Sequence, residues 1–230
     1  MHVNQPFPRQ SAPLSPPLRM EVEQPCVIIV DDHAPVREAL SELILSAGFR
    51  STGFASTREL LDADVLDSPG CLILDVRLPG ASGLDLQHHL AHSGNPKPII
   101  FLTGHGDIPM AVQAMKAGAV DFLTKPVRDQ TLLDAVSAAI AMDAAQRARA
   151  RKARLHVDRY KTLTRRERQV MGAVALGRLN KQIAFDLSIS EDTVKLHRCN
   201  FMRKMQLTSV GELVRVWEAL PAELRERTEA

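Results

Sequence analysis

Short apolar runs alternate with helical stripes along residues 25–141 of the chain. Runs of four to six residues between turn-forming residues predict buried strands, and apolar spacings of three and four predict amphipathic helices. The predicted strands are Cys26–Val30, Phe49–Phe54, Cys71–Asp75, Pro98–Thr103 and Ala119–Thr124. The predicted helices are Pro35–Ala47, a short helix from Ser56, Gly83–Ala91, Ile108–Ala117 and a long helix from about Asp129.

This alternation defines the expected fold class of the first domain. Strands that alternate with helices predict an α/β domain with a doubly wound, five-stranded parallel sheet and helices on both faces. The small version of such a sheet has the flavodoxin-like strand order 2-1-3-4-5.

A purely helical pattern follows and predicts a small all-α domain. Thr164–Glu167 has capping-box spacing and begins a helix that ends at Gly177. A short helix over Asn180–Leu187, a tight turn and a longer helix from Ser190 to about Met205 have helix-turn-helix order. A fourth helix is predicted over Ser209–Trp217. In the longer helix, the spacing turns Val194, Phe201 and Met205 toward the core.

These patterns divide the chain into four parts. We expect residues 1–24 to form a disordered tail, 25–141 the α/β domain, 142–160 a helical linker and 161–226 the helix-turn-helix domain. The first twenty residues contain five prolines and no periodicity. Met20, just before the first strand, is the expected true start of the protein.

Charge is distributed unevenly between the two domains. Residues 21–146 contain 8 Lys/Arg and 17 Asp/Glu, a net charge of −9, and residues 147–230 contain 19 and 10, a net charge of +9. A basic half joined to an acidic half indicates nucleic-acid binding by the basic half, although a solvated arginine-rich surface has the same composition.

Composition excludes several other classes of protein. Three cysteines, Cys26, Cys71 and Cys199, are too few and too scattered for a disulfide framework or a zinc site. No apolar run approaches the ~20 residues that cross a membrane, and the first twenty residues lack the apolar core of a signal peptide. We therefore expect a cytoplasmic protein without membrane contacts.

Polar side chains stand at the carboxyl ends of four predicted strands. They are Asp31 and Asp32, Asp75, Thr103 and Lys125. Because these strand ends meet at one edge of a parallel sheet, the side chains should line one pocket. Several carboxylates repel one another and favour a hard cation such as Mg²⁺. An aspartate nucleophile, a metal ion, a lysine and a hydroxyl together suit phosphoryl transfer.

Each of these residues also has an ordinary structural interpretation. Asp31 and Asp32 have the position of a cap for the next helix, and Lys125 alone is typical of a solvated lysine. The coincidence of all of them at successive strand ends favours a functional pocket. His33 and His105 flank this pocket, and we interpret both as surface histidines without metal-ligand spacing.

Residues from about Pro25 to Ala141 resemble the receiver domain of response regulators, especially the FixJ branch. The matching stretches are Val30–Asp32, Leu74–Gly80, Leu102–Gly104 and Asp121–Pro126. The resemblance implies that Asp75 accepts phosphate from a sensor histidine kinase. It implies that Mg²⁺ is held by Asp31 or Asp32, Asp75 and the backbone carbonyl of Arg77.

The same resemblance implies a switch. Thr103 would turn toward the phosphoryl group, Phe122 would swing inward behind it, and Lys125 would pair with the phosphate. The Lys125–Pro126 peptide bond is expected to be cis.

Residues from about Leu163 to Trp217 resemble the LuxR-type helix-turn-helix. The matching stretches are Leu163–Glu167, Asn180–Ala184, Ser190–Arg198 and Arg203–Met205. By this resemblance, Lys195 and Arg198 contact DNA and His197 contacts its backbone. Thr193 lies in the same half of the helix, and Lys181 begins the preceding helix, a suitable place for a phosphate contact.

Together these observations predict a bacterial two-component transcriptional regulator of the FixJ/NarL type that is not an enzyme. Its expected partners are a sensor histidine kinase, double-stranded promoter DNA, RNA polymerase and, on phosphorylation, a second copy that pairs through the face of Ile108–Ala117. An aspartyl-phosphate phosphatase is disfavoured because Arg77 stands where such an enzyme needs an acid-base aspartate. A phosphate-independent DNA-binding scaffold stays open.

Overall fold

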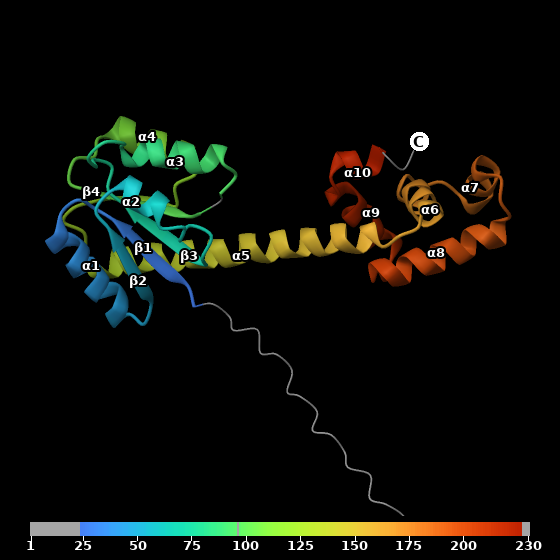
Figure 1. Ribbon diagram of the computed structural model, residues 1–230, viewed down its shortest axis with the longest axis horizontal. Helices are drawn as coiled ribbons and strands as arrows, with labels where there is room; N and C mark the ends of the chain where they lie inside the picture. The colour runs from blue at the N-terminus through green and yellow to red at the C-terminus, as the bar shows by residue number, and fades with distance from the viewer. Residues whose placement is uncertain (1–23, 96, 227–230) are drawn as a thin grey trace, which may run out of the picture.

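The computed structural model describes residues 24–95 and 97–226. The predicted tail, except for residue 24, and the predicted start at Met20 lie outside this part of the chain. No helix within the described ranges combines the length and apolar character that a membrane span requires. The described chain forms an α/β domain and a helical domain, joined by one long helix (Figure 1).

Five parallel strands form a single sheet in the order β2-β1-β3-β4-β5, which confirms the predicted strand order. The strands are β1 Cys26–Val30, β2 Arg50–Phe54, β3 Gly70–Leu74, β4 Ile99–Thr103 and β5 Asp121–Thr124. The register aligns Val30 of β1 with Leu74 of β3. The residues that follow them, Asp31 and Asp75, therefore leave the sheet at the same edge.

Helices cover both faces of the sheet. They are α1 Ala34–Ser46, α2 Thr57–Asp62, α3 Gly83–His92, α4 Ile108–Lys116 and the first part of α5 Asp129–Lys161. One core joins α1 and α5 to the sheet through Ile44 and Val136, and the other joins α2, α3 and α4 to it through Leu60, Leu86 and Ala114. The predicted doubly wound α/β class is confirmed.

Three strands begin later than the apolar pattern predicts: β4 by one residue, and β2 and β5 because the chain is still closing a helix. The amide of Phe49 donates to the carbonyl of Ile44, and the amide of Ala119 donates to the carbonyl of Ala114. β2 therefore begins at Arg50 and β5 at Asp121. Apolar character alone does not separate these helix ends from the strands that follow.

Helix α5 is continuous over 33 residues and leads from the sheet into the helical domain. The predicted linker, 142–160, is the second part of this helix. The start of this linker still contacts the sheet: Asp143 accepts a 2.9 Å hydrogen bond from the amide of Gly70, and Arg147 donates to the carbonyl of Ser68 at 2.7 Å.

The helical domain packs around its own core. Its helices are α6 Arg165–Ala175, α7 Asn180–Leu187, α8 Glu191–Met205, α9 Val210–Ala219 and α10 Ala222–Glu226. Tyr160, at the end of α5, is buried in this core together with Phe201 and Trp217. The sequence did not predict α10, because this helix of five residues buries none of its side chains.

Candidate functional site

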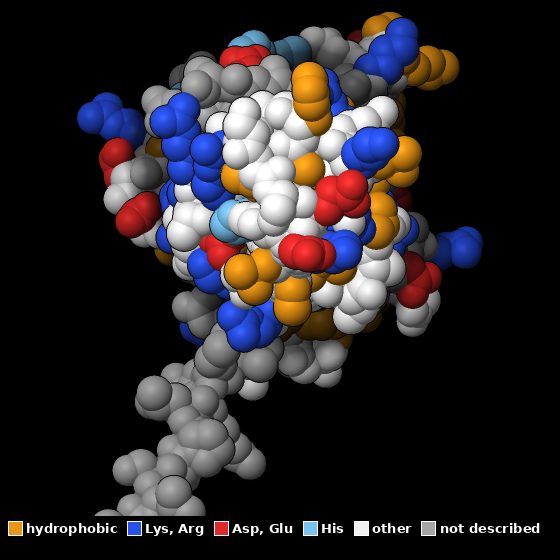
Figure 2. All heavy atoms as spheres, turned by 90° about the vertical axis from the view of Figure 1, so that its right-hand side faces the viewer, with side chains coloured by type: hydrophobic (Ala, Val, Ile, Leu, Met, Phe, Trp, Pro, Cys, Tyr) orange, Lys and Arg blue, Asp and Glu red, His pale blue; other side chains and the backbone are white. Residues whose placement is uncertain are grey.

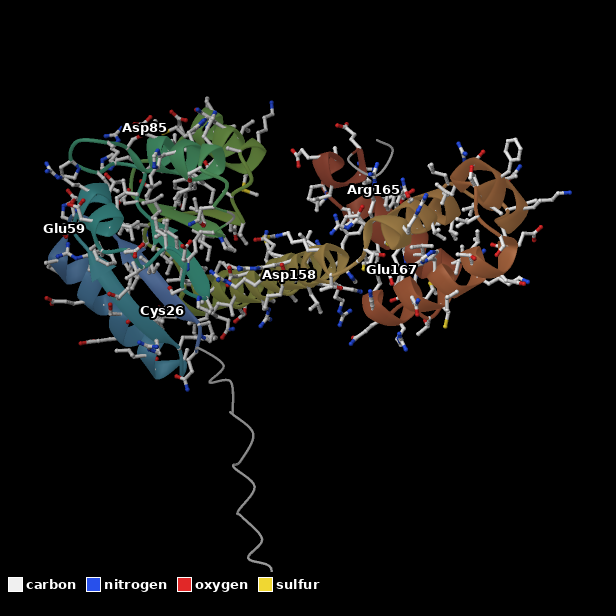
Figure 3. The ribbon with its side chains drawn as sticks, turned by 45° about the vertical axis from the view of Figure 1, so that its right-hand side comes forward. Cys26, Glu59, Asp85, Asp158, Arg165 and Glu167 are labelled. Atoms are coloured by element: carbon white, nitrogen blue, oxygen red, sulfur yellow. The ribbon has the colours of Figure 1, made fainter. Side chains whose placement is uncertain are left out.

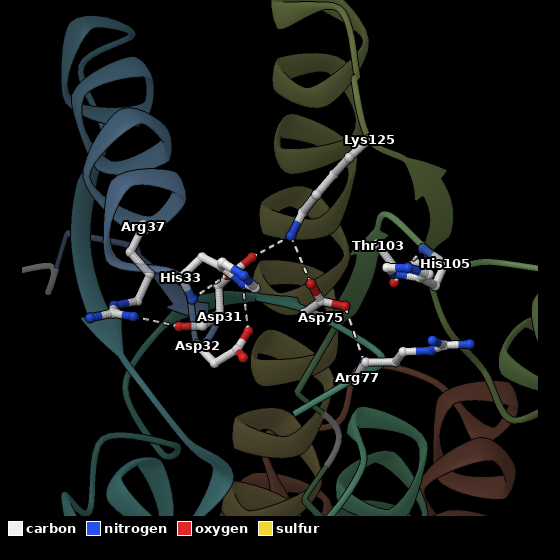
Figure 4. Close-up of polar contacts among 9 residues, drawn as sticks. All are labelled: Asp31, Asp32, His33, Arg37, Asp75, Arg77, Thr103, His105 and Lys125. Atoms are coloured by element: carbon white, nitrogen blue, oxygen red, sulfur yellow. Dashed lines mark hydrogen bonds and ion pairs between the residues drawn. The ribbon is translucent and has the colours of Figure 1, made fainter. Parts of the chain in front are cut away.

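Three charged side chains meet at the carboxyl edge of the sheet (Figure 4). Asp31 follows β1, Asp75 follows β3 and Lys125 follows β5. The Nζ atom of Lys125 donates to the Oδ2 atom of Asp75 at 2.7 Å and to the Oδ2 atom of Asp31. Both carboxylates are buried, and the lysine is partly exposed. Of the five residues predicted to line this pocket, the structure thus brings Asp31, Asp75 and Lys125 into contact, whereas Asp32 lies against His33 and the Thr103 hydroxyl accepts from the His105 amide.

Backbone contacts hold Asp75 in place. Its amide donates to the carbonyl of Val30 at 2.9 Å, which extends the pairing of β1 and β3 by one residue. The amide of Arg77 donates to the Oδ1 atom of Asp75 at 3.1 Å. Helix α3 begins close by, and a Cβ atom on Gly83 would stand only 2.3 Å from the carbonyl oxygen of Asp75. Glycine at position 83 therefore permits the close approach of α3 to the pocket.

The pocket favours the charged forms of its central pair. Burial alone would raise the pKa of Asp75, but the hydrogen bonds from Lys125 and the Arg77 amide, together with the nearby Thr103 hydroxyl, outweigh burial and lower this pKa. Burial alone would lower the pKa of Lys125, but hydrogen bonds to Asp31 and Asp75 raise it. Asp75 is therefore an ionised carboxylate at neutral pH, with a cation beside it.

Asp31, Asp32 and His33 form a cluster that could hold a metal ion. Although His33 is exposed, its Nδ1 atom lies 2.9 Å from an oxygen of Asp32 and 3.8 Å from one of Asp31. His33 is exposed, as predicted for a surface histidine, but the turn of the chain after β1 brings its ring within reach of both carboxylates. The His33 amide donates to Asp31 at 2.9 Å, which holds this turn.

Arg37 also supports this side of the pocket, and the sequence analysis missed it. Its guanidinium donates to the backbone carbonyl of Asp31 at 2.7 Å. The bond joins a strand end to α1, so no local sequence signal marks it.

Asp31, Asp32 and Asp75 supply the carboxylate oxygens that Mg²⁺ prefers, and their chemistry fits that ion.

Thr103 and Phe122 both lie against the loop that follows β4. Thr103 is fully buried, and its hydroxyl accepts a 3.3 Å hydrogen bond from the amide of His105. Phe122 is half-buried, with its ring centroid 5.9 Å from that of Phe101. A Cβ atom on Gly106 would stand 2.7 Å from the Phe122 ring, so the loop after β4 touches this ring directly. Because the same loop contacts both side chains, a movement of Thr103 would displace the atoms that pack against Phe122.

The helix-turn-helix forms as the sequence predicts. Helix α7 ends at Leu187, and the next residue, Ser188, has a left-handed backbone with φ of 53°. Ser190 then caps α8 by accepting a hydrogen bond from the amide of Thr193 at 3.1 Å. Val194, Phe201 and Met205 are fully buried, which confirms the predicted core face of α8.

The predicted DNA contacts differ in their freedom to reach DNA. Lys181 and Lys195 are exposed, and Lys195 donates to Asp192 at 2.9 Å. Thr193, His197 and Arg198 are half-buried. Arg198 donates to the side chain of Asn180 at 2.7 Å and so joins α8 to the first residue of α7. Sequence reasoning missed Asn180, because this pairing depends on how the two helices cross.

The end of the molecule formed by the helical domain has a basic side. Figure 2 shows Lys and Arg side chains gathered on the left of this end. Helix α8 therefore belongs to a domain whose surface suits a polyanion, in agreement with its charge of +9 over residues 147–230.

A phosphoacceptor-like pocket followed by a helix-turn-helix defines a DNA-binding response regulator. The family description "Response regulator receiver domain" matches residues 27–137, and "Bacterial regulatory proteins, luxR family" matches residues 161–217. The chain is 50% identical over 194 residues to the response regulator protein TodT of Pseudomonas putida, a match that covers 84% of this chain and 86% of TodT. The chain therefore belongs to the response regulators that join a receiver domain to a LuxR-type helix-turn-helix.

Solved structures agree with this assignment. The response regulator StyR is similar with a TM-score of 0.74 and 43% identity, over 85% of this chain and 98% of that one. Full-length FixJ from B. japonicum is similar with a TM-score of 0.52 and 40% identity, over 85% of this chain and 96% of that one. The predicted FixJ-type resemblance is confirmed, and the chain is a transcriptional response regulator.

Proposed function

We propose that Asp75 accepts a phosphoryl group from a sensor histidine kinase and that this event controls transcription through α8. The contact of Lys125 with both Asp31 and Asp75 carries the proposal. It joins a carboxylate nucleophile, a second acidic residue and a mobile cation in one pocket. In the transfer, an Asp75 oxygen forms the new bond to phosphorus while the bond from phosphorus to the kinase histidine nitrogen breaks.

The neighbours of Asp75 have separate roles in this proposal. Lys125 leaves one carboxylate contact and pairs with the phosphoryl oxygens, and the Thr103 hydroxyl donates to the same group. Asp31, Asp32, Asp75 and the backbone carbonyl of Arg77 would hold Mg²⁺. When bound there, such an ion would supply positive charge for the phosphoryl oxygens. Because Arg77 is not an acid-base residue, we propose an acceptor that is not a turnover enzyme.

The switch is proposed to run through the loop after β4. When Thr103 turns toward the phosphoryl group, the loop at Gly106 releases the ring of Phe122, which moves inward. The adjoining surface of α4 exposes Ile108, Val112 and Met115. We propose that a second copy covers this surface and pairs the two DNA-binding domains.

The helical domain is proposed to read promoter DNA with α8 in the major groove. Lys195 and Arg198 contact bases, and Lys181, Thr193 and His197 contact the backbone. Arg198 reaches a base either after its hydrogen bond to Asn180 breaks or with that bond intact. RNA polymerase is the proposed partner at the promoter, and the cytoplasm is the proposed location. The proposed boundaries are 25–141 for the receiver and 161–226 for the DNA-binding domain.

Intact-protein mass spectrometry after incubation with acetyl phosphate and Mg²⁺ tests the acceptor. We expect one phosphoryl adduct on the wild-type protein and none on Asp75→Asn, because the amide is a poor nucleophile. Asp64→Asn, on an exposed loop of the same domain, is the control and should be modified like the wild type. An adduct on Asp75→Asn, or none on the wild type, would count against the proposal.

A further inference from the structure

The middle of α5 stands free between the two domains. Residues 148–155, here called the basic segment, are all exposed, although they belong to one uninterrupted helix. Figure 3 shows side chains of this part of α5 reaching into solvent next to Asp158. The segment contains Arg149, Arg151, Lys152 and Arg154 and no acidic residue. No packing within the described chain explains why this exposed stretch carries so much charge of one sign.

The arginines of the basic segment form no ion pair in the described part of the chain, and the nearest acidic residue along the helix, Asp158, lies one turn beyond Arg154. In these ranges, Arg149, Arg151 and Arg154 make no hydrogen bond or ion pair. Lys152 differs from them, because its charge adds to the hydrogen bonds from Thr208 that lower the pKa of Glu212. The pairs 149/152 and 151/154 also place like charges three residues apart, a spacing that disfavours the helix. A polyanion bound along the segment would relieve this repulsion.

The arginines on either side of the basic segment, unlike those within it, form hydrogen bonds inside the chain. Arg147 donates to Asp143 at 2.8 Å and to the carbonyl of Ser68. Arg159 donates to the carbonyl of Met205 at 3.3 Å and to the side chain of Gln206. These arginines fix α5 to the receiver at one end and to the end of α8 at the other. The arginines between them are left available for a partner outside the chain.

We propose that the basic segment contacts the DNA phosphate backbone beside the site read by α8, an inference that rests on the proposed DNA-binding function. Helix α8 has 15 residues and is about 22 Å long, whereas the major groove is about 8.5 Å deep. With its N-terminal half in the groove, its C-terminal end emerges beside a phosphate strand. The contact of Arg159 with Met205 and Gln206 joins α5 at that end.

Distance along the helix is consistent with this placement. Arg154 precedes Arg159 by five residues, which is about 7.5 Å along the helix axis. Its side chain is turned about 140° around the helix axis from that of Arg159, and that of Arg151 about 80°, so these arginines would reach phosphates that flank the bound groove rather than phosphates beneath α8. Such contacts neutralise phosphate charge without reading bases, so they strengthen binding to all sequences alike.

The acidic receiver of a second copy is the competing occupant of the basic segment. Residues 21–146 have a net charge of −9 and would also attract the arginines. DNA is favoured because α5 is fixed to α8, so DNA is beside the segment whenever α8 is bound. If DNA occupies the segment, replacing its arginines lowers DNA affinity. If a second copy occupies it, the same replacement changes self-association.

The test compares the full-length R151Q/R154Q variant with wild type by measuring DNA affinity at several salt concentrations. Glutamine keeps the helix propensity and removes the charge. The probes are a random-sequence duplex and a duplex that the wild-type protein selects from a randomised pool. We expect affinity to fall by the same factor on both probes. The slope of log K against log salt should decrease by about 0.9 for each phosphate that the variant no longer neutralises.

Two further variants separate this effect from a general change in charge or in folding. R50Q/R58Q removes two exposed charges from the receiver and should keep the wild-type slope. R151K/R154K keeps both positive charges and should also keep the wild-type slope. A wild-type slope for R151Q/R154Q overturns the inference, and so does a change in sedimentation without a change in slope, which favours the second copy. If the wild-type protein selects no duplex from the randomised pool and does not bind the random-sequence duplex, the proposed function itself fails.

Discussion

Glu167 connects three parts of the DNA-binding domain through one buried carboxylate. It accepts hydrogen bonds from the Thr164 amide at 2.8 Å and from the Nζ atom of Lys204 at 2.7 Å. Burial alone would raise its pKa, but the bonds from Lys204 and Thr164 lower it. The carboxylate thus stabilises the fold above its ordinary pKa near 4.5, and this contribution disappears as pH falls through the lowered value.

We predict that Glu167→Gln lowers the free energy of unfolding at neutral pH by about 1–3 kcal/mol, because Lys204 loses its ionised partner. The variant should also lose stability less steeply than the wild type below pH 4.5. Urea unfolding followed by Trp217 fluorescence at several pH values measures both effects. Glu218→Gln, at an exposed position of α9, is the control, and an equal loss of stability in both variants would contradict the prediction.

At the level of single residues, sequence could predict positions but not pairings. Asp75 and Lys125 were predictable because each directly follows a recognisable strand, and parallel strands end at a common edge. The contact of Arg37 with the Asp31 carbonyl and that of Arg198 with Asn180 were not. Both depend on the angle between two neighbouring elements, which apolar spacing does not determine.

At the level of elements, α5 is attached to the receiver by a polar cluster beyond the apolar core. Asp143 is buried and accepts from the Gly70 amide and from Arg147. Lys97 donates to the Ser68 carbonyl at 2.6 Å, beside the Arg147 contact. Burial lowers the pKa of Lys97, and the nearby Asp143 partly offsets this effect. Asp143 is thus the counter-charge for two cations.

We predict that Asp143→Asn loosens this attachment, because asparagine still accepts from Gly70 but leaves Arg147 without an ionised partner. The expected cost is about 1–3 kcal/mol. Hydrogen exchange should become faster in residues 141–148 of α5 while the sheet core stays protected. Asp134→Asn, on an exposed position of α5, is the control. Unchanged exchange in Asp143→Asn would show that apolar contacts alone hold the helix.

The same cluster explains why the element boundaries were harder to predict than the elements. The sequence predicts a receiver that ends at 141, because apolar periodicity fades there. The structure continues the attachment through Asp143 and Arg147, whose bonds to Gly70 and Ser68 span more than seventy residues of chain. Long-range polar contacts of this kind leave no periodic signal in the sequence.

At the level of the whole molecule, an exposed apolar surface on α4 is the proposed site of pairing. Ile108 is 81% exposed, and Val112 and Met115 are each 45% exposed. Exposed apolar side chains that cluster on one face are typical of interfaces between proteins. The surface lies next to the Gly106 loop, so a rearrangement of that loop changes its shape.

We predict that Ile108→Glu prevents phosphorylation-dependent pairing, because a carboxylate in place of the most exposed apolar side chain of this surface would have to be buried without a partner. Sedimentation velocity after treatment with acetyl phosphate measures the effect. The wild-type protein should shift toward a dimer, and the variant should stay monomeric while still accepting phosphate at Asp75. Leu45→Glu, at an exposed apolar position on α1, should dimerise like the wild type. A dimer of Ile108→Glu would place the interface elsewhere.

The continuity of α5 also gives the molecule a rotational phase. A single helix of 33 residues, about 50 Å long, joins a sheet at one end to a DNA-reading helix at the other. Each residue turns the direction in which the second domain faces by about 100° around the helix axis. The number of residues between Arg147 and Arg159 therefore sets the angle between the α4 surface and α8. One added residue would rotate the DNA-binding domain of each paired copy relative to its receiver. Seven added residues make nearly two full turns and would nearly restore the original orientation.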